Sequence, residues 1–333
     1  MKKTLWISVL LCAMFAACKP HQTRLVVYNG QTQGGTFHMK YYAGADSLAI
    51  QQSIDSLLRV ISSTASVFDS TSIISKVNNN QPVELNQHFI NLFNKAVEVS
   101  KASQGCFDFT VGPLVRAWGF WRKKGINPTP KQVDSLRAFV GYQTVKIENG
   151  KVIKQFPQSM LDFNAIAQGY TVDVLCDYLM SRNCNDFVVE VGGEVRAHGF
   201  KNKTENWLVG IEKPAIDPND NQTIQEKVTL KNKAMATSGN YRKFFIKDGK
   251  KYPHSINPFT GYPVTHSMLS VTVLANDCTT ADAYGTVFMV LGLQKSKEFI
   301  KTHPGFEAYY IYADSLGYNK TEFTQGFQSM IVK

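Results

Sequence analysis

Apolar residues recur at three- and four-residue spacing in several stretches of the chain, the period of a helix with one buried face. Between residues 46 and 66 these positions are Leu48, Ile50, Ile54, Leu57, Leu58 and Ile61. The pattern returns between residues 87 and 103 with Phe89, Leu92, Phe93, Ala96, Val97 and Val99. It predicts helices over both stretches, with Asp46 as the N-cap of the first. Similar reasoning predicts helices over 167–180, 279–291 and 295–302, and a short helix after the Pro-marked loop within 125–141.

Shorter apolar stretches bounded by Gly, Asn and Pro predict strands. Three hairpins are expected, namely 24–43 around a Gly-Gly turn, 144–156 around Asn149-Gly150, and 186–200 around Gly192-Gly193. Further strands are expected within 206–212, 225–239, 242–252, 267–275 and 306–313. Because hairpin turns dominate, we expect an α+β domain with a mixed, largely antiparallel sheet and packed helices, and not a doubly wound sheet.

Composition and charge narrow the class of protein. The chain has 333 residues, of which 44% are hydrophobic and 19% charged, which suits one domain of catalytic size. Its 36 Lys and Arg outnumber 26 Asp and Glu, but the excess is scattered along the chain. A solvated basic surface is the simplest interpretation, with anionic ligands or a membrane as the alternative. A nucleic-acid partner is not expected, because its footprint would be more clustered.

The amino-terminal stretch "MKKTLWISVLLCAMFAACKP" has the order of an export signal, with two lysines, an apolar segment and small residues. The apolar segment is too short for a transmembrane helix. Cys18 directly after Ala16-Ala17 resembles a bacterial lipobox, although Phe15 stands where Leu is usual. The resemblance implies that Cys18 is diacylated. The alternative is an ordinary secretory signal that is cut near Cys18.

Lipidation would divide the chain into three parts and place it in the cell. We expect a lipoprotein signal peptide over 1–17, the lipidated cysteine and a tether over 18–23, and a catalytic domain over 24–333. The domain would then lie on the periplasmic side of a bacterial cell envelope, held to the inner or outer membrane by lipid alone. Four cysteines remain, Cys106, Cys176, Cys184 and Cys278. Their spacing fits no metal motif, and it leaves open whether they form disulfides or stay free.

One pair of oxygen-bearing side chains stands out on the predicted helix of residues 279–291. Asp282 and Thr286 are four residues apart, so both face one side of that helix. A carboxylate and a hydroxyl suit a hard cation that also binds phosphate and water. The alternative is a helix-start cap and a hydroxyl bonded within the helix. The stretch "LDFNAIAQGYTVD" adds small residues at a helix start, where something could approach the backbone closely.

Several motifs occur in an order that resembles the FAD:protein FMN transferases of the ApbE family. They are "SVFDSTSIISKVN", "GCFDFTVGPLVRAWGF", "LDFNAIAQGYTVD", "VEVGGEVRAHG", "ATSGNYRKFF", "HSINPFTG" and "TADAYGTVFMVLG". The resemblance covers nearly all of the chain after the signal and implies a T-fold-like architecture. It further implies that the protein splits FAD between its phosphates, assisted by Mg²⁺, and passes FMN to a Thr or Ser hydroxyl of an acceptor flavoprotein, releasing AMP.

The resemblance also assigns roles to individual residues. Asp282, Thr286 and the backbone carbonyl of Ala165 match the family's metal ligands. The stretch Cys106-Phe107-Asp108 matches one that lines the flavin site, with a turn around a buried Phe as the alternative. Phe68 lies where the family has an aromatic residue in contact with flavin, with core packing as the alternative.

Other matched residues concern the nucleotide and the reaction. Thr237-Ser238-Gly239 matches a loop that approaches the nucleotide, with a plain turn as the alternative. Asp173 either binds the ligand or is a helix-surface acid, and Gly193 belongs to a Gly-Gly-acid motif. Arg196, three residues later, has a structural ion pair as its alternative role. His254 could orient phosphate or take the acceptor hydroxyl's proton, and Asp282 is assigned a catalytic as well as a metal role.

Three departures from the family pattern bear on function. Gln168, expected at the nucleotide, replaces a common Lys; Gly34 stands where a flavin-contacting Met is usual; and Asn257 replaces an Asp. Two alternatives to the transferase therefore stay open. Water could replace the acceptor, which would make the protein an FAD pyrophosphatase yielding FMN and AMP. It could instead be a non-catalytic flavin-binding lipoprotein.

Overall fold

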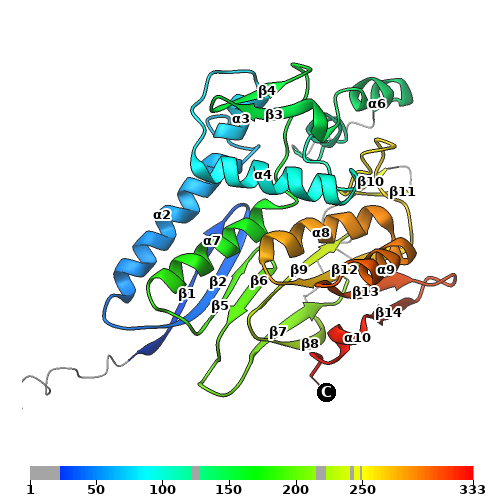
Figure 1. The fold of residues 1–333 in the computed structure, drawn as a ribbon. Coiled ribbons are helices and arrows are strands. Elements are labelled where there is room, and N and C mark those ends of the chain that lie inside the picture. Colours follow the sequence, from blue (N-terminus) through cyan, green and yellow to red (C-terminus); the bar gives the residue numbers. More distant parts are fainter. Residues whose placement is uncertain (1–22, 122–127, 215–222, 241–243, 248–249, 333) are drawn as a thin grey trace, which may run out of the picture.

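An antiparallel sheet forms the centre of the computed structural model, which describes residues 23–121, 128–214, 223–240, 244–247 and 250–332 (Figure 1). In the described part of the chain this sheet has eight strands, in the order β1-β2-β5-β6-β9-β12-β13-β14. Their bounds are β1 Arg24–Thr32, β2 Gly35–Ala43, β5 Phe187–Val191, β6 Glu194–His198, β9 Lys233–Gly239, β12 Met268–Ala275, β13 Glu307–Ala313 and β14 Asn319–Phe323. Each neighbouring pair is antiparallel, so the expected α+β class with a largely antiparallel sheet is confirmed.

The β1–β2 hairpin shows why glycine occupies position 34. Thr32 pairs with Gly35, which leaves a two-residue loop. Gln33 and Gly34 both have positive φ, 51° and 75°, as the favoured type I′ turn requires. Glycine adopts this conformation without strain, so the turn itself accounts for Gly34 in place of a longer side chain.

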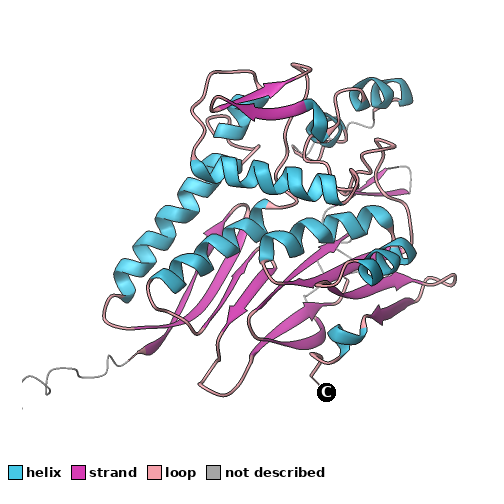
Figure 2. Ribbon diagram, viewed as in Figure 1, coloured by secondary structure: helices cyan, strands magenta, loops and turns pink. Residues whose placement is uncertain are grey.

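Helices cover one face of the sheet (Figures 1 and 2). They are α2 Ser47–Ala65, α4 Gln87–Ala102, α7 Ala167–Ser181, α8 Cys278–Leu291 and α9 Leu293–Thr302. The predicted apolar stripe of α2 is confirmed at Ile50, Ile54 and Leu58, which are buried against β1, β2, β5 and α7. Asp46 is the N-cap residue of α2, as expected, although its side chain makes no cap hydrogen bond. It pairs with Arg182 at 2.9 Å instead.

A smaller layer covers part of the other face. The hairpin of β7 Trp207–Glu212 and β8 Ile224–Leu230 lies there with the short helix α10 Gln325–Gln328. Trp207, Val228, Leu230 and Phe327 are buried against side chains of β6, β9, β12 and β13. A turn at Lys231-Asn232 divides the apolar stretch expected within 225–239 into β8 and β9.

The remaining elements lie outside the sheet and the helices that cover it, most of them at the top of Figure 1. They are α3 Ile73–Asn78, α5 Gly112–Ala117, α6 Pro130–Arg137, the 3₁₀ turn η1 Tyr142–Thr144, β3 Val145–Glu148, β4 Lys151–Lys154, β10 Phe244–Lys247 and β11 Lys250–Pro253. Helix α6 begins with a capping box between Thr129 and Gln132. The sequence does not predict α3, α5, α10 or β14. The three helices are too short for a helical period to be seen, and β14 is a short strand at the edge of the sheet.

The structure answers the question of the cysteines but not that of the amino-terminal segment. The four cysteines Cys106, Cys176, Cys184 and Cys278 are free thiols, and the last three are buried. Cys18 and residues 1–17, expected to form a signal peptide, lie outside the described residues. Among the described residues, no helix is long and apolar enough to cross a membrane.

Candidate active site

The stretch before α7 is anchored by hydrogen bonds that the sequence analysis missed. Buried Asn78, the last residue of α3, donates to the Leu161 carbonyl at 2.8 Å and accepts from the Leu161 amide at 2.7 Å. Asp162 accepts from the indole of Trp121 at 2.7 Å and from the Asn164 amide at 2.7 Å. These bonds fix the turn of residues 164–166 from which α7 begins.

The start of α7 lies directly against α8. The Gly169 amide donates to Oδ2 of Asp282 at 2.9 Å, and Asp282 is only 6% exposed. A Cβ on Gly169 would overlap the Cys278 carbonyl and lie 2.7 Å from the Asp282 Cβ, so the two helices touch through their backbones. Ala165, four residues before Gly169, is half-buried, as is Thr286 one turn after Asp282. The predicted ligand-bearing stretches are therefore neighbours.

The turn between β5 and β6 reaches the same helix start. The Gln168 side chain packs onto Gly192, where a Cβ would overlap its amide group. The adjacent Gly193 amide donates to Oε1 of Glu190 at 2.6 Å. From the β1–β2 turn, Gln33 donates to the Thr171 hydroxyl at 2.5 Å. Two hairpin turns thus meet the first turns of α7, and they bring Gln168 and Gly193 beside the Gly169–Asp282 contact.

The predicted Thr-Ser-Gly loop is in fact the end of strand β9, and alternation along the strand separates its two hydroxyls. Ser238 faces α8, because a Cβ on Gly285 would lie 2.5 Å from its Oγ. Thr237 faces the other side of the sheet, where its hydroxyl lies 2.8 Å from that of Thr272 on β12. Of the three residues, Ser238 is the one whose side chain is shown against the Asp282-bearing helix.

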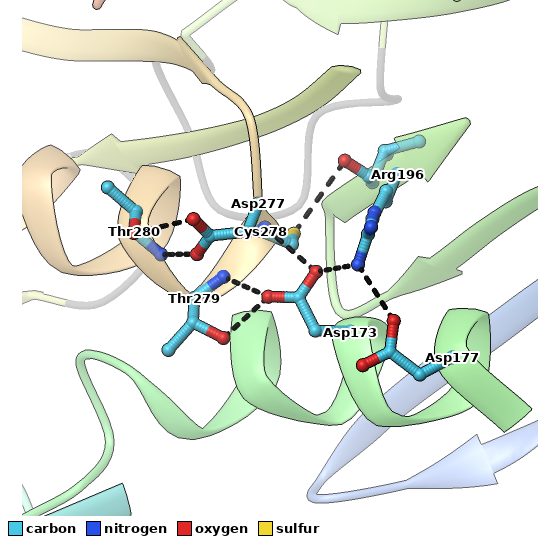
Figure 3. Close-up of polar contacts among 8 residues, drawn as sticks. Asp173, Asp177, Arg196, Asp277, Cys278, Thr279 and Thr280 are labelled. Carbon is cyan, nitrogen blue, oxygen red and sulfur yellow. Dashed lines mark hydrogen bonds and ion pairs between the residues drawn. The ribbon is translucent and has the colours of Figure 1, made fainter. Parts of the chain in front are cut away.

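Asp173 is not an exposed helix acid, and its contact with a ligand stays a prediction (Figure 3). It is 8% exposed, and its oxygens accept from the amides of Cys278 and Thr279 at 3.0 and 2.8 Å, from the Thr279 hydroxyl at 2.6 Å, and from Arg196 at 2.8 Å. Burial raises the pKa of this carboxyl, against the opposing effect of the hydrogen bonds and of Arg196. The ion pair considered for Arg196 is confirmed, and Asp177 adds a second contact to it at 3.4 Å.

The Cys106-Phe107-Asp108 stretch forms a buried turn. Phe107 is 2% exposed in the core shared with α4, α8 and β12. Asp108 accepts from the amide and hydroxyl of Thr110 and from the Tyr142 amide, at 2.6 to 2.8 Å. Burial raises the pKa of Asp108 and that of the half-buried Cys106 thiol. The structure shows this organising role, and the contact with flavin stays a prediction.

Phe68 and His254 lie on connections outside these contacts. Phe68 is 57% exposed in the turn after α2, so core packing does not explain it. His254, after β11, is half-buried and meets the Phe120 ring edge-on at 6.4 Å. Asn257 accepts from the amides of Phe259 and Thr260 through its Oδ1, at 2.9 and 3.2 Å. An amide oxygen serves this turn as well as a carboxylate would, so the Asp-to-Asn departure keeps the local structure.

The comparisons with known proteins decide the family. The family model described as "ApbE family" matches residues 33–310, which is more than half of the chain. The chain belongs to the ApbE family.

Curated relatives and solved structures are similar to this chain over almost its whole length. The FAD:protein FMN transferase of Haemophilus influenzae is 34% identical, over 88% of each chain. The flavin transferase ApbE from Vibrio cholerae is 30% identical, with a TM-score of 0.81, covering 93% of this chain and all of that one. The flavinyl transferase ApbE of Pseudomonas stutzeri, in its apo form, is 28% identical with a TM-score of 0.82, covering 94% of this chain and 98% of its own.

The residues present fit a Mg²⁺ ion of the kind expected from the ApbE motifs. Asp282 supplies a buried carboxylate whose direction the Gly169 amide fixes, and Thr286 lies one helical turn further along. Oxygen donors of this kind, together with a backbone carbonyl, suit a cation that keeps room for substrate phosphate and water. No group of three or more His, Cys, Asp or Glu residues that could hold a metal occurs in the described ranges, and the expected set includes only one such residue.

Proposed function

We propose that this chain is an FAD:protein FMN transferase. Supporting this are the family model, relatives of that name, and the contact that carries the argument, Gly169 to Asp282 at the start of α7. The reaction would split FAD at its diphosphate. An acceptor Thr or Ser oxygen forms a bond to the FMN phosphorus, the bond from that phosphorus to the bridging oxygen breaks, and AMP leaves with that oxygen. The acceptor hydroxyl loses its proton to a base.

The chain's own groups divide the work. Asp282, Thr286 and the Ala165 carbonyl would hold Mg²⁺, which when bound neutralises charge on the diphosphate oxygens. The Gly169 amide holds Asp282 in one direction, and the β5–β6 turn with Gln168 borders the same helix start. Ser238, whose side chain faces α8, would donate its hydroxyl to a phosphate or ribose oxygen. His254 is the candidate base or phosphate-orienting group, because an imidazole can accept a proton or donate a hydrogen bond.

The proposal includes a place in the cell. Its support is the order of residues 1–18, with Cys18 after two alanines, and the start of the folded domain at β1 only a few residues later. Diacylation of Cys18 would hold the domain to a bacterial inner or outer membrane, on the periplasmic side. The acceptor would then be an exported or membrane-bound redox protein.

Mass spectrometry of an acceptor protein after incubation with FAD and Mg²⁺ tests the function. We expect covalent FMN on a Thr or Ser and release of AMP, with Asp282→Asn slowing transfer at least about 100-fold. Asp177→Asn is the matched control, because it removes an exposed carboxylate from α7 without touching α8. Free FMN and AMP with unmodified acceptor would instead show a pyrophosphatase. Flavin binding with no AMP released would show a non-catalytic flavin-binding protein.

A further inference from the structure

Helices α7 and α8 exchange hydrogen bonds in both directions. Near the start of α8, Asp173 of α7 accepts from the backbone amides of Cys278 and Thr279. One helical turn away on both helices, Asp282 of α8 accepts from the Gly169 amide of α7. Each helix therefore places a carboxylate on backbone amides of the other, and the two contacts together fix the register between them.

We propose that Asp173 is a positioning residue for the transfer reaction. It fixes the first turn of α8, and through that turn the places of Asp282 and Thr286 relative to the Ala165 carbonyl. This inference rests on the proposed function, because it assigns Asp173 a task only if those three groups act together on a metal and a diphosphate.

Capping alone does not require Asp173. The residue before α8, Asp277, already accepts from the amide and hydroxyl of Thr280 at 2.8 and 2.9 Å (Figure 3). One such cap is the usual arrangement for a helix start. Asp173, on α7, accepts from the amides of Cys278 and Thr279, just before Thr280. Its bonds therefore link α8 to α7 as well as capping α8.

Burial and charge make this tie rigid. Asp173 is 8% exposed, and Arg196 of β6 approaches the same oxygen that accepts from the Cys278 amide. The guanidinium thus ties the carboxylate to the central sheet as well as to α8. At Gly169 the helices are in backbone contact, so a displaced α8 start would also displace Asp282. Ligand positions held by outer hydrogen bonds commonly determine metal affinity, and small displacements are costly for catalysis.

Binding of Mn²⁺, a paramagnetic stand-in for Mg²⁺, separates positioning from folding. Free Mn²⁺ is measured by electron paramagnetic resonance while it is titrated into the full chain, with and without FAD. Asp173→Asn keeps the shape of the side chain and removes its charge, and we expect it to weaken Mn²⁺ binding about tenfold. Circular dichroism checks that the variant is folded at the titration temperature. Thr279→Val, which removes a single donor to Asp173, should weaken binding about twofold to threefold and serves if Asp173→Asn does not fold.

Two control variants define what a merely structural role would do. Asp177→Asn removes the other acidic partner of Arg196, on the same helix, and should leave Mn²⁺ binding unchanged. Asp277→Ala removes the local cap of α8 and should lower the melting temperature with little effect on Mn²⁺ binding. A folded Asp173→Asn, or a Thr279→Val used in its place, that binds Mn²⁺ as tightly as the unmodified chain would overturn the positioning role. If the unmodified chain retains no Mn²⁺, or Asp282→Asn retains it equally, the proposed metal site is what fails.

Discussion

The starts of α7 and α8 touch each other, yet they are built in opposite ways. Two carboxylates close the start of α8, with Asp277 on the Thr280 amide and Asp173 on the amides of Cys278 and Thr279. The N-cap position of α7 is occupied by Ile166, whose side chain cannot accept a hydrogen bond. Instead, Asp282 reaches across from α8 to the Gly169 amide. Since the first amides of a helix lack intrahelical partners, the two starts differ in where those partners come from.

The difference explains why small residues stand where α7 begins. A capped helix start needs only a good capping residue, and side chains can pack around it. At the start of α7, the Gly169 amide lies against the buried Asp282 carboxylate and the Cys278 carbonyl. Gly169 permits this approach because it has no side chain. The start of α8 is therefore closed by side chains, whereas the start of α7 leaves its backbone against Asp282, the proposed metal ligand.

Gly169→Ala should break this comparison most strongly. In most helices Ala is the more stable residue by about 1 kcal/mol. Here the added methyl would overlap the Cys278 carbonyl, and backbone cannot move aside as a side chain can. We expect unfolding in urea to show a net loss of about 2 to 4 kcal/mol, within the range for overpacked cores and strained sites. Transfer activity should fall with it, as α8 is pushed away.

A glycine without such a neighbour provides the control for that variant. Gly150, in the β3–β4 turn, has φ of 71° and open space around its Cβ position. Gly150→Ala should cost about 1 kcal/mol from backbone strain and leave the transfer rate unchanged. If Gly169→Ala proved as stable as the unmodified chain, the close contact between the two helices would be wrong.

Asp277→Ala tests the closed start of α8. The variant loses two hydrogen bonds to Thr280 and should reduce the free energy of unfolding by about 1 kcal/mol, the usual value of an N-cap. Transfer should continue at close to the original rate, because Asp173 still holds the preceding amides. Asn86→Ala at the start of α4, whose side chain accepts from the Phe89 amide, is a matched cap variant on another helix. A rate as low as that of Asp282→Asn would show that Asp277, and not Asp173, sets the position of α8.

The two helix starts also show what the sequence could reveal and what it could not. Periodicity located α2, α4, α7 and α8, because their apolar faces cover the sheet over several turns. The stretch "GYTVD" indicated only an acid on a helix, since its partners at Cys278 and Thr279 lie more than a hundred residues away in the sequence. The bonds from Asn78 to Leu161 and from Trp121 to Asp162 are also non-local, across 83 and 41 residues. Alternation along β9 separates Thr237 from Ser238, and only the structure shows that Ser238 is the one that faces α8.

His88 of α4 contacts the first turn of α7, and its substitution is expected to change stability least of these variants. Its Nδ1 lies 2.9 Å from the hydroxyl of Tyr170, the residue after Gly169. Burial lowers the pKa of His88 below its ordinary value of 6.5. Between that value and the lower pKa of the folded chain, the unfolded chain binds more protons, so the free energy of unfolding decreases as the pH falls through this window. Above the window His88 contributes no pH dependence.

His88→Gln should remove that dependence, which unfolding in urea at a series of pH values on both sides of the ordinary pKa can measure. The difference in stability between the unmodified chain and the variant should shift against the unmodified chain as the solution becomes more acidic. Because the side chain is only half-buried, this change should be smaller than the effect of either helix-start variant. A shift in the opposite direction would mean that protonated His88 is favoured beside Tyr170.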